Sequence, residues 1–182
     1  FLNTSTFLGD ANTDQSTFGG GVTFATNGGT LGLQGKIITT NDAVVTAAGA
    51  ITLGADAEID TGAAGGVITI GAGGVANGGT FDVILKSGTG AITVAGTTVV
   101  TDLDIRTTGG ATFTGNVTVN DLITTATSGI VTLNGAANTF VAAVDFLNAS
   151  TFLGNADTDQ STFGGGVTFA TRGGTLGLQG KI

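Results

Sequence analysis

The chain has 182 residues, of which 34 are Gly and 35 are Thr, while Pro, Cys, Met, Trp, Tyr and His are absent. Without Cys and His, the sequence excludes disulfides, thiolate metal sites and the Ser-His-Asp and Cys-His catalytic sets. Thirteen acidic and five basic residues give a net charge of −8, which repels phosphate backbones and anionic membrane surfaces. We therefore expect no nucleic-acid partner, and the apolar runs are too short to insert this segment into a membrane.

Residues 1–37 reappear as residues 146–182, shifted by 145 positions, and 33 of the 37 residues are identical. No Gly and no large apolar residue differs between the two copies. This pattern predicts one full repeat unit over residues 1–145 and the start of the next unit over residues 146–182. We expect the repeats to form a longer array, either because the chain continues covalently or because subunits stack end to end.

A shorter rhythm runs through the unit, in which an apolar-Thr-apolar triplet follows a Gly or lies within a few residues of one. In chain order these triplets are residues 22–24, 51–53, 68–70, 92–94, 117–119 and 131–133. Each alternates with period 2, so each predicts a short strand whose apolar side chains point to one face and whose Thr points to the other. Nine of the eleven Phe residues directly follow a Thr, which predicts the same outward Thr and inward Phe.

Short strands of this kind could form a sandwich, a barrel or a solenoid, and the repeat decides among them. A closed barrel cannot accept a further copy, whereas each coil of a solenoid pairs only with the coils above and below it. The sequence therefore predicts an all-β, parallel β-solenoid of about 20–24 residues per coil, with about six or seven coils in each unit. Positive-φ corners are expected at Asn-Gly and Gly-Gly pairs, such as Asn27-Gly28-Gly29, Gly65-Gly66 and Asn77-Gly78-Gly79.

Three segments share the form Gly-Ala-Ile-Thr-Leu, at residues 49–53, 90–94 and 129–133. In these segments the chain resembles the filamentous haemagglutinin-like and related β-strand-repeat surface proteins of bacteria. The resemblance implies a right-handed parallel β-helix in a very large secreted or cell-surface protein that serves in adhesion or as a fibrous stalk.

One polar cluster has the D-x-N-x-D spacing of the first half of an EF-hand calcium loop. The spacing occurs in both copies, as Asp10, Asn12 and Asp14 and as Asn155, Asp157 and Asp159. A true EF-hand is excluded, because Gln15 replaces the Gly of the sharp turn and Gly21 replaces the bidentate Glu. Two interpretations stay open: a solvated turn, since these are ordinary turn residues, and a weak Ca²⁺ site. No other cofactor is expected.

Two acidic stretches, residues 56–60 and 102–106, alternate charged and apolar side chains. The simplest interpretation is an exposed strand with a buried back, whose charges deter edge-to-edge aggregation. A cation between coils and a paired-carboxylate glycosidase centre are the alternatives.

The leading hypothesis is a non-enzymatic, fibre- or stalk-forming segment of a large repetitive extracellular or cell-surface protein, adhesive or matrix-forming, whose partners are itself and surface glycans. The alternative is a module that recognises glycan, mineral or ice through an outward Thr-rich face. That alternative requires the threonines to align on one flat side, and their uneven spacing argues against alignment. An enzyme acting through Asp56, Glu58 or Asp60 is not expected.

Overall fold

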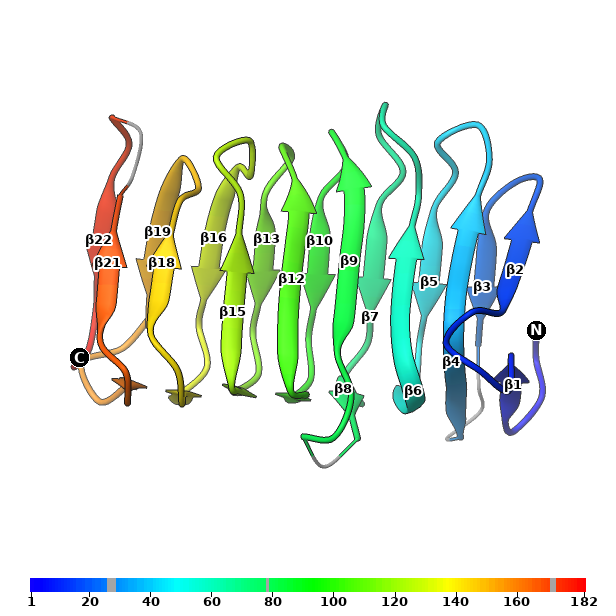
Figure 1. The fold of residues 1–182 in the computed structure, drawn as a ribbon, viewed down its shortest axis with the longest axis horizontal. Helices are drawn as coiled ribbons and strands as arrows, with labels where there is room; N and C mark the ends of the chain where they lie inside the picture. The colour runs from blue at the N-terminus through cyan, green and yellow to red at the C-terminus, as the bar shows by residue number, and fades with distance from the viewer. Residues whose placement is uncertain (26–28, 78, 171–172) are drawn as a thin grey trace.

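A computed structural model describes residues 1–25, 29–77, 79–170 and 173–182, and these form a β-solenoid of about eight turns. All its strand pairs are parallel, and no described residue is helical. Figure 1 shows the front strands running upward and the strands behind them running downward, while the chain advances from right to left. The coil is therefore right-handed, as parallel crossovers generally are. The predicted fold class is confirmed.

Each turn has three faces, and the chain visits them in a fixed order. The strands of the first face are β1 (Thr6–Leu8), the first half of β4 (Thr30–Thr39), the first half of β6 (Ala50–Asp60), β8 (Val75–Ala76), β11 (Thr98–Val99), β14 (Val117–Val119), β17 (Ala137–Phe140) and β20 (Gln160–Phe163). Those of the second face are β2 (Gln15–Phe18), the second halves of β4 and β6, β9 (Val83–Gly88), β12 (Asp102–Thr107), β15 (Asp121–Thr124), β18 (Val144–Phe146) and β21 (Val167–Phe169). Those of the third face are β3 (Val22–Phe24), β5 (Val45–Ala47), β7 (Ile68–Ile70), β10 (Ile92–Val94), β13 (Ala111–Phe113), β16 (Ile130–Leu133), β19 (Ser150–Leu153) and β22 (Leu176–Leu178).

The length of a turn can be followed along the third face, where each strand pairs in register with the strand one turn later. Successive partners are Val22, Val45, Ile68, Ile92, Ala111, Val131, Thr151 and Leu176. The shortest of these turns runs from Ile92 to Ala111, and the longest runs from Thr151 to Leu176. The coil length predicted from the sequence is therefore close to the observed spacings.

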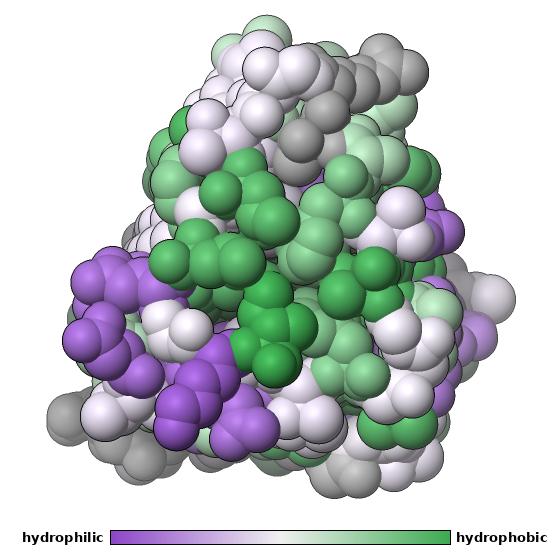
Figure 2. Space-filling model, turned by 90° about the vertical axis from the view of Figure 1, so that its left-hand side faces the viewer, coloured by the Kyte–Doolittle hydropathy of each residue, from purple (hydrophilic) through white to green (hydrophobic). Residues whose placement is uncertain are grey.

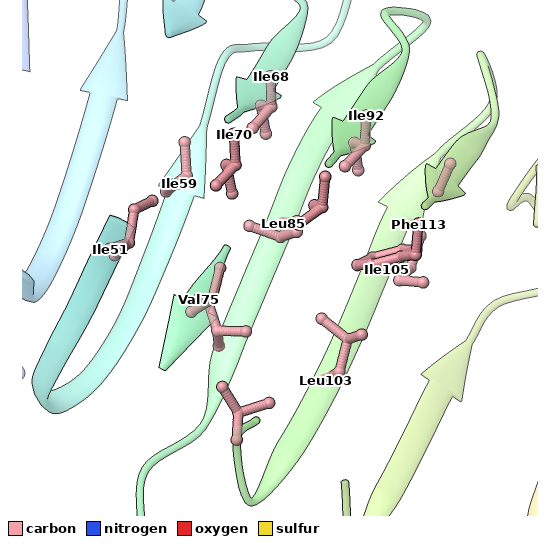
Figure 3. Packing of buried hydrophobic residues seen from close by; sticks show 14 of the residues in the cluster. Ile51, Ile59, Ile68, Ile70, Val75, Leu85, Ile92, Leu103, Ile105 and Phe113 are labelled. Atoms are coloured by element: carbon pink, nitrogen blue, oxygen red, sulfur yellow. The ribbon is translucent and has the colours of Figure 1, made fainter. Parts of the chain in front are cut away.

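The core runs the length of the solenoid because like residues stack from turn to turn. Side chains such as Ile59, Leu85 and Ile105 on the second face are fully buried and meet third-face residues such as Ile70 across the interior (Figure 3). The alternation of the triplets produces this arrangement, since every second side chain of a strand points inward. Hydrophobic burial along one continuous column therefore holds the turns together.

Corners between faces follow the Gly-rich signals in part. Gly65 and Gly79 have positive φ angles of 133° and 76°, as predicted, whereas Gly66 does not. Asn27, Gly28 and Gly78 lie outside the described residues. A corner without any Gly was not predicted: Asn41 and Asp42 adopt positive φ there. Asn and Asp are the non-Gly residues that tolerate this conformation best.

The predicted outward Thr and inward Phe is wrong at two equivalent places, Thr6-Phe7 and Thr151-Phe152. Thr6 and Thr151 are buried there, and the Phe rings point outward. The reason lies one turn further on, where Gly32 pairs with Phe7 and Gly177 pairs with Phe152. A Cβ added to either Gly would lie 2.4 Å or less from the ring, so each ring covers a Gly that lacks a side chain.

The second copy of the repeat makes the same internal ring contacts as the first, but on different faces. Rings Phe1, Phe18 and Phe24 form a cluster with one stacked pair at 5.2 Å and two edge-to-face pairs. Their equivalents Phe146, Phe163 and Phe169 form the same cluster, with the stacked pair at 5.1 Å. Phe24 belongs to the third face, whereas Phe169 belongs to the second. The contacts are therefore a property of the sequence and do not depend on the face.

Candidate interaction surfaces

Six outward threonines form a continuous column on the third face, which we call the threonine ladder. Its members are Thr23, Thr46, Thr69, Thr93, Thr112 and Thr132, each in register with the next. Neighbouring turns of a sheet are about 4.8 Å apart, so the hydroxyl groups repeat at about that interval along the axis. Phe152 ends the ladder one turn beyond Thr132.

The ladder corrects the expectation that uneven spacing would scatter the threonines. The irregular lengths are absorbed at the corners and in the other strands, so the third-face triplets still stack. Thr52 is an exception, because it pairs with Gly32 on the first face. The predicted triplet at residues 51–53 therefore belongs to a different side of the solenoid from the triplets around Thr69 and Thr93.

The charged residues gather on the second face. Of the thirteen acidic residues, all of which the structure describes, eight lie in second-face strands or directly before one: Asp56, Glu58, Asp60, Asp82, Asp102, Asp104, Asp121 and Asp145. Their inward neighbours, such as Ile59 and Leu103, are fully buried. The buried back that the sequence predicted for residues 56–60 and 102–106 is confirmed, but the charged side is exposed only in part, because Asp104 is itself buried at 7% exposure. The strands described for the third face carry no charged residue.

Three cations, Lys36, Lys86 and Arg106, neutralise part of this charged face, and Arg106 pairs with Asp104 on its own strand. Lys36 and Lys86 each reach a carboxylate on β6, with distances of 2.8 Å from Lys36 Nζ to Glu58 Oε2 and 2.6 Å from Lys86 Nζ to Asp60 Oδ2. Both pairs join adjacent turns. The hydrogen bond to Glu58 raises the pKa of Lys36. Such partly exposed pairs contribute little each, about 0–1 kcal/mol, but they fix the side chains that line this face.

A column of four aspartates follows the corner between the first and second faces. Its members are Asp56, Asp82, Asp102 and Asp121. One oxygen of each of the first three carboxylates accepts the backbone N–H of the aspartate one turn later, at 3.1, 3.2 and 3.2 Å. We call this set the aspartate column.

The aspartate column places like charges close together. Burial raises the pKa of Asp82, and the neighbouring carboxylates of Asp102 and Asp56 raise it further. The pKa of Asp121 is also raised, first by burial and then by Asp102. The repulsion between these carboxylates destabilises the fold. The hydrogen bonds of the column oppose that effect, because they join the corner of each turn to the corner of the next.

The residues of the predicted calcium motif form the loops that precede β2 and β20. Asp14 Oδ2 accepts the backbone N–H groups of Asp10 and Ala11 at 2.8 and 3.3 Å. The equivalent Asp159 Oδ2 accepts those of Asn155 and Ala156 at 2.8 and 3.0 Å. The last acidic residue therefore closes a turn in both copies, and the hydrogen bond from the Asp10 amide lowers the pKa of Asp14.

Asn12 lies apart from these turn bonds, in a hollow of about 260 Å³ that it lines with Lys36, Asp56, Glu58 and Asp82. Within the described ranges, no three His, Cys, Asp or Glu side chains are grouped so that they could hold a metal ion. Asp157, the equivalent of Asn12, is exposed. The structure thus brings Asn12 to the charged face, and the Ca²⁺ site stays a prediction.

Two features of these surfaces escaped prediction, and both depend on register. Asp82 and Asp121 were not singled out, although each directly precedes an inward residue, as Asp56 and Asp102 do. That shared position was the available signal. The alignment of the threonines carried no local signal, because it is set by the number of residues in each turn.

Comparison of the chain with family models, curated proteins and solved structures found no match. The described residues contain no helix that could cross a membrane.

Proposed function

We propose that the chain is a rod-forming structural segment of a large repetitive protein of the extracellular space or cell surface, and that it serves in adhesion or in a matrix. The observation that carries this proposal is the packing of the two copies of residues 1–37. Each copy makes the same internal ring contacts and strand pairs, although the copies lie at different heights and on different faces. A sequence whose internal packing does not depend on its position along the solenoid is suited to tandem repetition.

The resemblance to filamentous haemagglutinin-like surface proteins supports the same role and supplies the extracellular location. The end of the solenoid that carries the C-terminus also has an apolar surface. Figure 2 shows hydrophobic side chains gathered at the centre of that end. The last third-face strand, β22, carries Leu176 and Leu178, which are 36% and 52% exposed. In the first copy, β6 pairs with the equivalent segment, residues 31–33. In the first copy, the next turn of the solenoid therefore covers the equivalent surface.

We propose no enzymatic role. The carboxylates suggested for a glycosidase centre are engaged as follows: Glu58 pairs with Lys36, Asp60 pairs with Lys86, and Asp56 accepts the amide of Asp82. Each side chain has a structural partner that also holds neighbouring turns together.

The test is the growth of the particle with the number of units. Chains carrying one, two and four copies of residues 1–145, each followed by residues 1–37, should lengthen by about 32 Å per added unit at constant width, because each turn advances about 4.8 Å. Small-angle X-ray scattering measures both quantities. Particles that widen in proportion to their mass would contradict a rod.

A second candidate function rests on the threonine ladder. A flat, uncharged column of hydroxyl and methyl groups at a regular interval suits a repetitive partner such as a crystalline glycan, a mineral or ice. We therefore propose surface recognition through the third face as the alternative role.

This alternative is tested by replacing Thr46, Thr69 and Thr93 with Ala. Binding to crystalline cellulose and to hydroxyapatite, and the inhibition of ice growth, should fall at least about tenfold if the ladder makes the contact, which corresponds to about 1.4 kcal/mol. Replacement of Thr118 and Thr139 on the first face is the matched control and should change nothing. Equal behaviour of both variants would remove the ladder from consideration.

A further inference from the structure

The two copies of residues 1–37 differ in the face on which they lie. In the first copy, β1 is on the first face, β2 on the second and β3 on the third. Their equivalents β19, β20 and β21 lie on the third, first and second faces. Every strand of the second copy has therefore moved back by one face.

Individual residues confirm the shift. Gln15 pairs with Lys36 on the second face, and the equivalent Gln160 pairs with Lys181 on the first. Thr23 pairs with Thr46 on the third face, whereas its equivalent Thr168 pairs with Asp145 on the second. The inward or outward orientation of each side chain is preserved, so the shift is a rotation of the whole segment about the axis.

The length of the unit accounts for the rotation. From β1 to β19 the chain completes six turns and two further faces, so one repeat unit fills six and two-thirds turns. Three units then fill twenty turns, and only after three units does an equivalent strand return to the same face. At about 4.8 Å per turn, this full period is about 96 Å.

We propose that the repeat is phased so that each unit in a tandem array is rotated by one third of a turn relative to the unit before it. This inference rests on the proposed rod and specifies its surface. The aspartate column and the ion pairs of the second face would face one side in the first unit, a second side in the next and the third side in the one after. The threonine ladder would follow in the same rotation, one face away.

Such a rod displays one kind of interaction surface in three directions. A partner that binds the charged face or the ladder would meet an identical site on every side, spaced by about 96 Å along each side and by about 32 Å along the spiral. The array would therefore connect partners around its whole circumference. A unit with a whole number of turns would present them along one side only.

The rotation can be tested in this chain by disulfide mapping, because the sequence has no Cys. Neighbouring outward positions on paired strands are close enough for a disulfide. Thr23→Cys with Thr46→Cys should form one on the third face. Asp145→Cys with Thr168→Cys should form one on the second face, and Phe152→Cys with Thr168→Cys should not. A disulfide in the last pair and none between positions 145 and 168 would overturn the rotation.

A second experiment extends the test to the array. Three units followed by residues 1–37, with Thr17→Cys in each unit and a gold-cluster label on each thiol, should appear in electron cryo-microscopy as rods whose labels turn by a third of a circle at each step. Rods with all labels along one side would overturn the proposed phase and leave the rod standing. Particles that are not rods would overturn the proposed function, and the disulfide pattern would still decide the rotation.

Discussion

At the scale of single residues, the aspartate column combines stabilising hydrogen bonds to backbone amides with destabilising repulsion between its carboxylates. The carboxylates of Asp82 and Asp121 have raised pKa values, so the folded protein binds protons at these sites more readily than the unfolded chain does. The resulting penalty is present at neutral pH. It is lifted as the pH falls through the folded pKa values and is gone below the pKa of the unfolded chain.

We therefore expect Asp102→Asn to stabilise the protein at neutral pH by up to about 0.5 kcal/mol, a value kept small because these groups are only partly buried and water screens their charges. The amide keeps an oxygen that can accept the Asp121 N–H while the charge is removed. Urea denaturation at pH 7 and near pH 4 should show the gain only at the higher pH. Asp157→Asn is the matched control, since the first copy carries Asn at that position. Equal effects of the two variants would contradict the account.

Asp159 closes its loop with two hydrogen bonds, so Asp159→Ala should lower the free energy of unfolding by about 1–2 kcal/mol. Asp159→Asn retains one acceptor oxygen and should lose less. At the equivalent Asp14, folding lowers the pKa, so the contribution of that carboxylate is present above the unfolded pKa and is lost as the pH falls through the folded one. A urea midpoint unchanged by Asp159→Ala would show that the loop does not need its carboxylate.

The same hydrogen bonds bear on calcium. Because Asp14 Oδ2 and Asp159 Oδ2 already serve backbone amides, we expect the unfolding temperature to be the same in millimolar CaCl₂ and in EDTA. Calorimetry measures both. A rise in calcium that is lost in Asp159→Ala would instead establish the weak site that the D-x-N-x-D spacing suggests.

At the scale of the strands, the triplets cannot accept an added residue without losing their register, whereas the corners accept differences in length. One extra residue inside a strand moves every following side chain to the opposite face. Turns of different length nevertheless coexist in this chain, as the short turn from Ile92 to Ala111 and the long one from Thr151 to Leu176 show. Inserting one Gly between Thr93 and Val94 should cost several kcal/mol, of the order of a lost core side chain.

The control for this insertion is one Gly placed between Gly19 and Gly20, where an added Cβ would meet no atom within 4 Å. It should cost less than about 1 kcal/mol, because loop entropy grows slowly with length. Thermal unfolding of both variants gives the comparison. Similar losses would mean that the corners are as constrained as the strands.

The same contrast explains what the sequence could predict. The strand around Thr69 is encoded locally, since Ile68 and Ile70 flank an outward Thr, and its existence and orientation could be predicted. Which face holds it depends on the count of residues through every preceding corner, including the unpredicted one at Asn41 and Asp42. The outward Phe7 could not be predicted either, because the reason for it, Gly32, lies a full turn away.

At the scale of the whole molecule, a net charge of −8 is carried largely on one side of the solenoid. Like-charged sides repel at low ionic strength, and at about 0.1 M salt this repulsion is screened beyond about 10 Å. We expect light scattering from concentrated solutions to rise with added salt as molecules associate side by side. Replacement of Asp56 and Asp102 by Asn should shift the rise to lower salt, and an unchanged salt dependence would contradict this.

The parallel stacking also determines how the protein would respond to being pulled along its axis. Each turn is hydrogen-bonded only to its two neighbours, so tension at one end would unfold the turns one at a time, starting from that end. A turn of about 22 residues that advances about 4.8 Å when folded spans about 75 Å when drawn out straight. Every turn released would thus lengthen its part of the chain about fifteenfold and would dissipate energy while the remaining turns keep their shape.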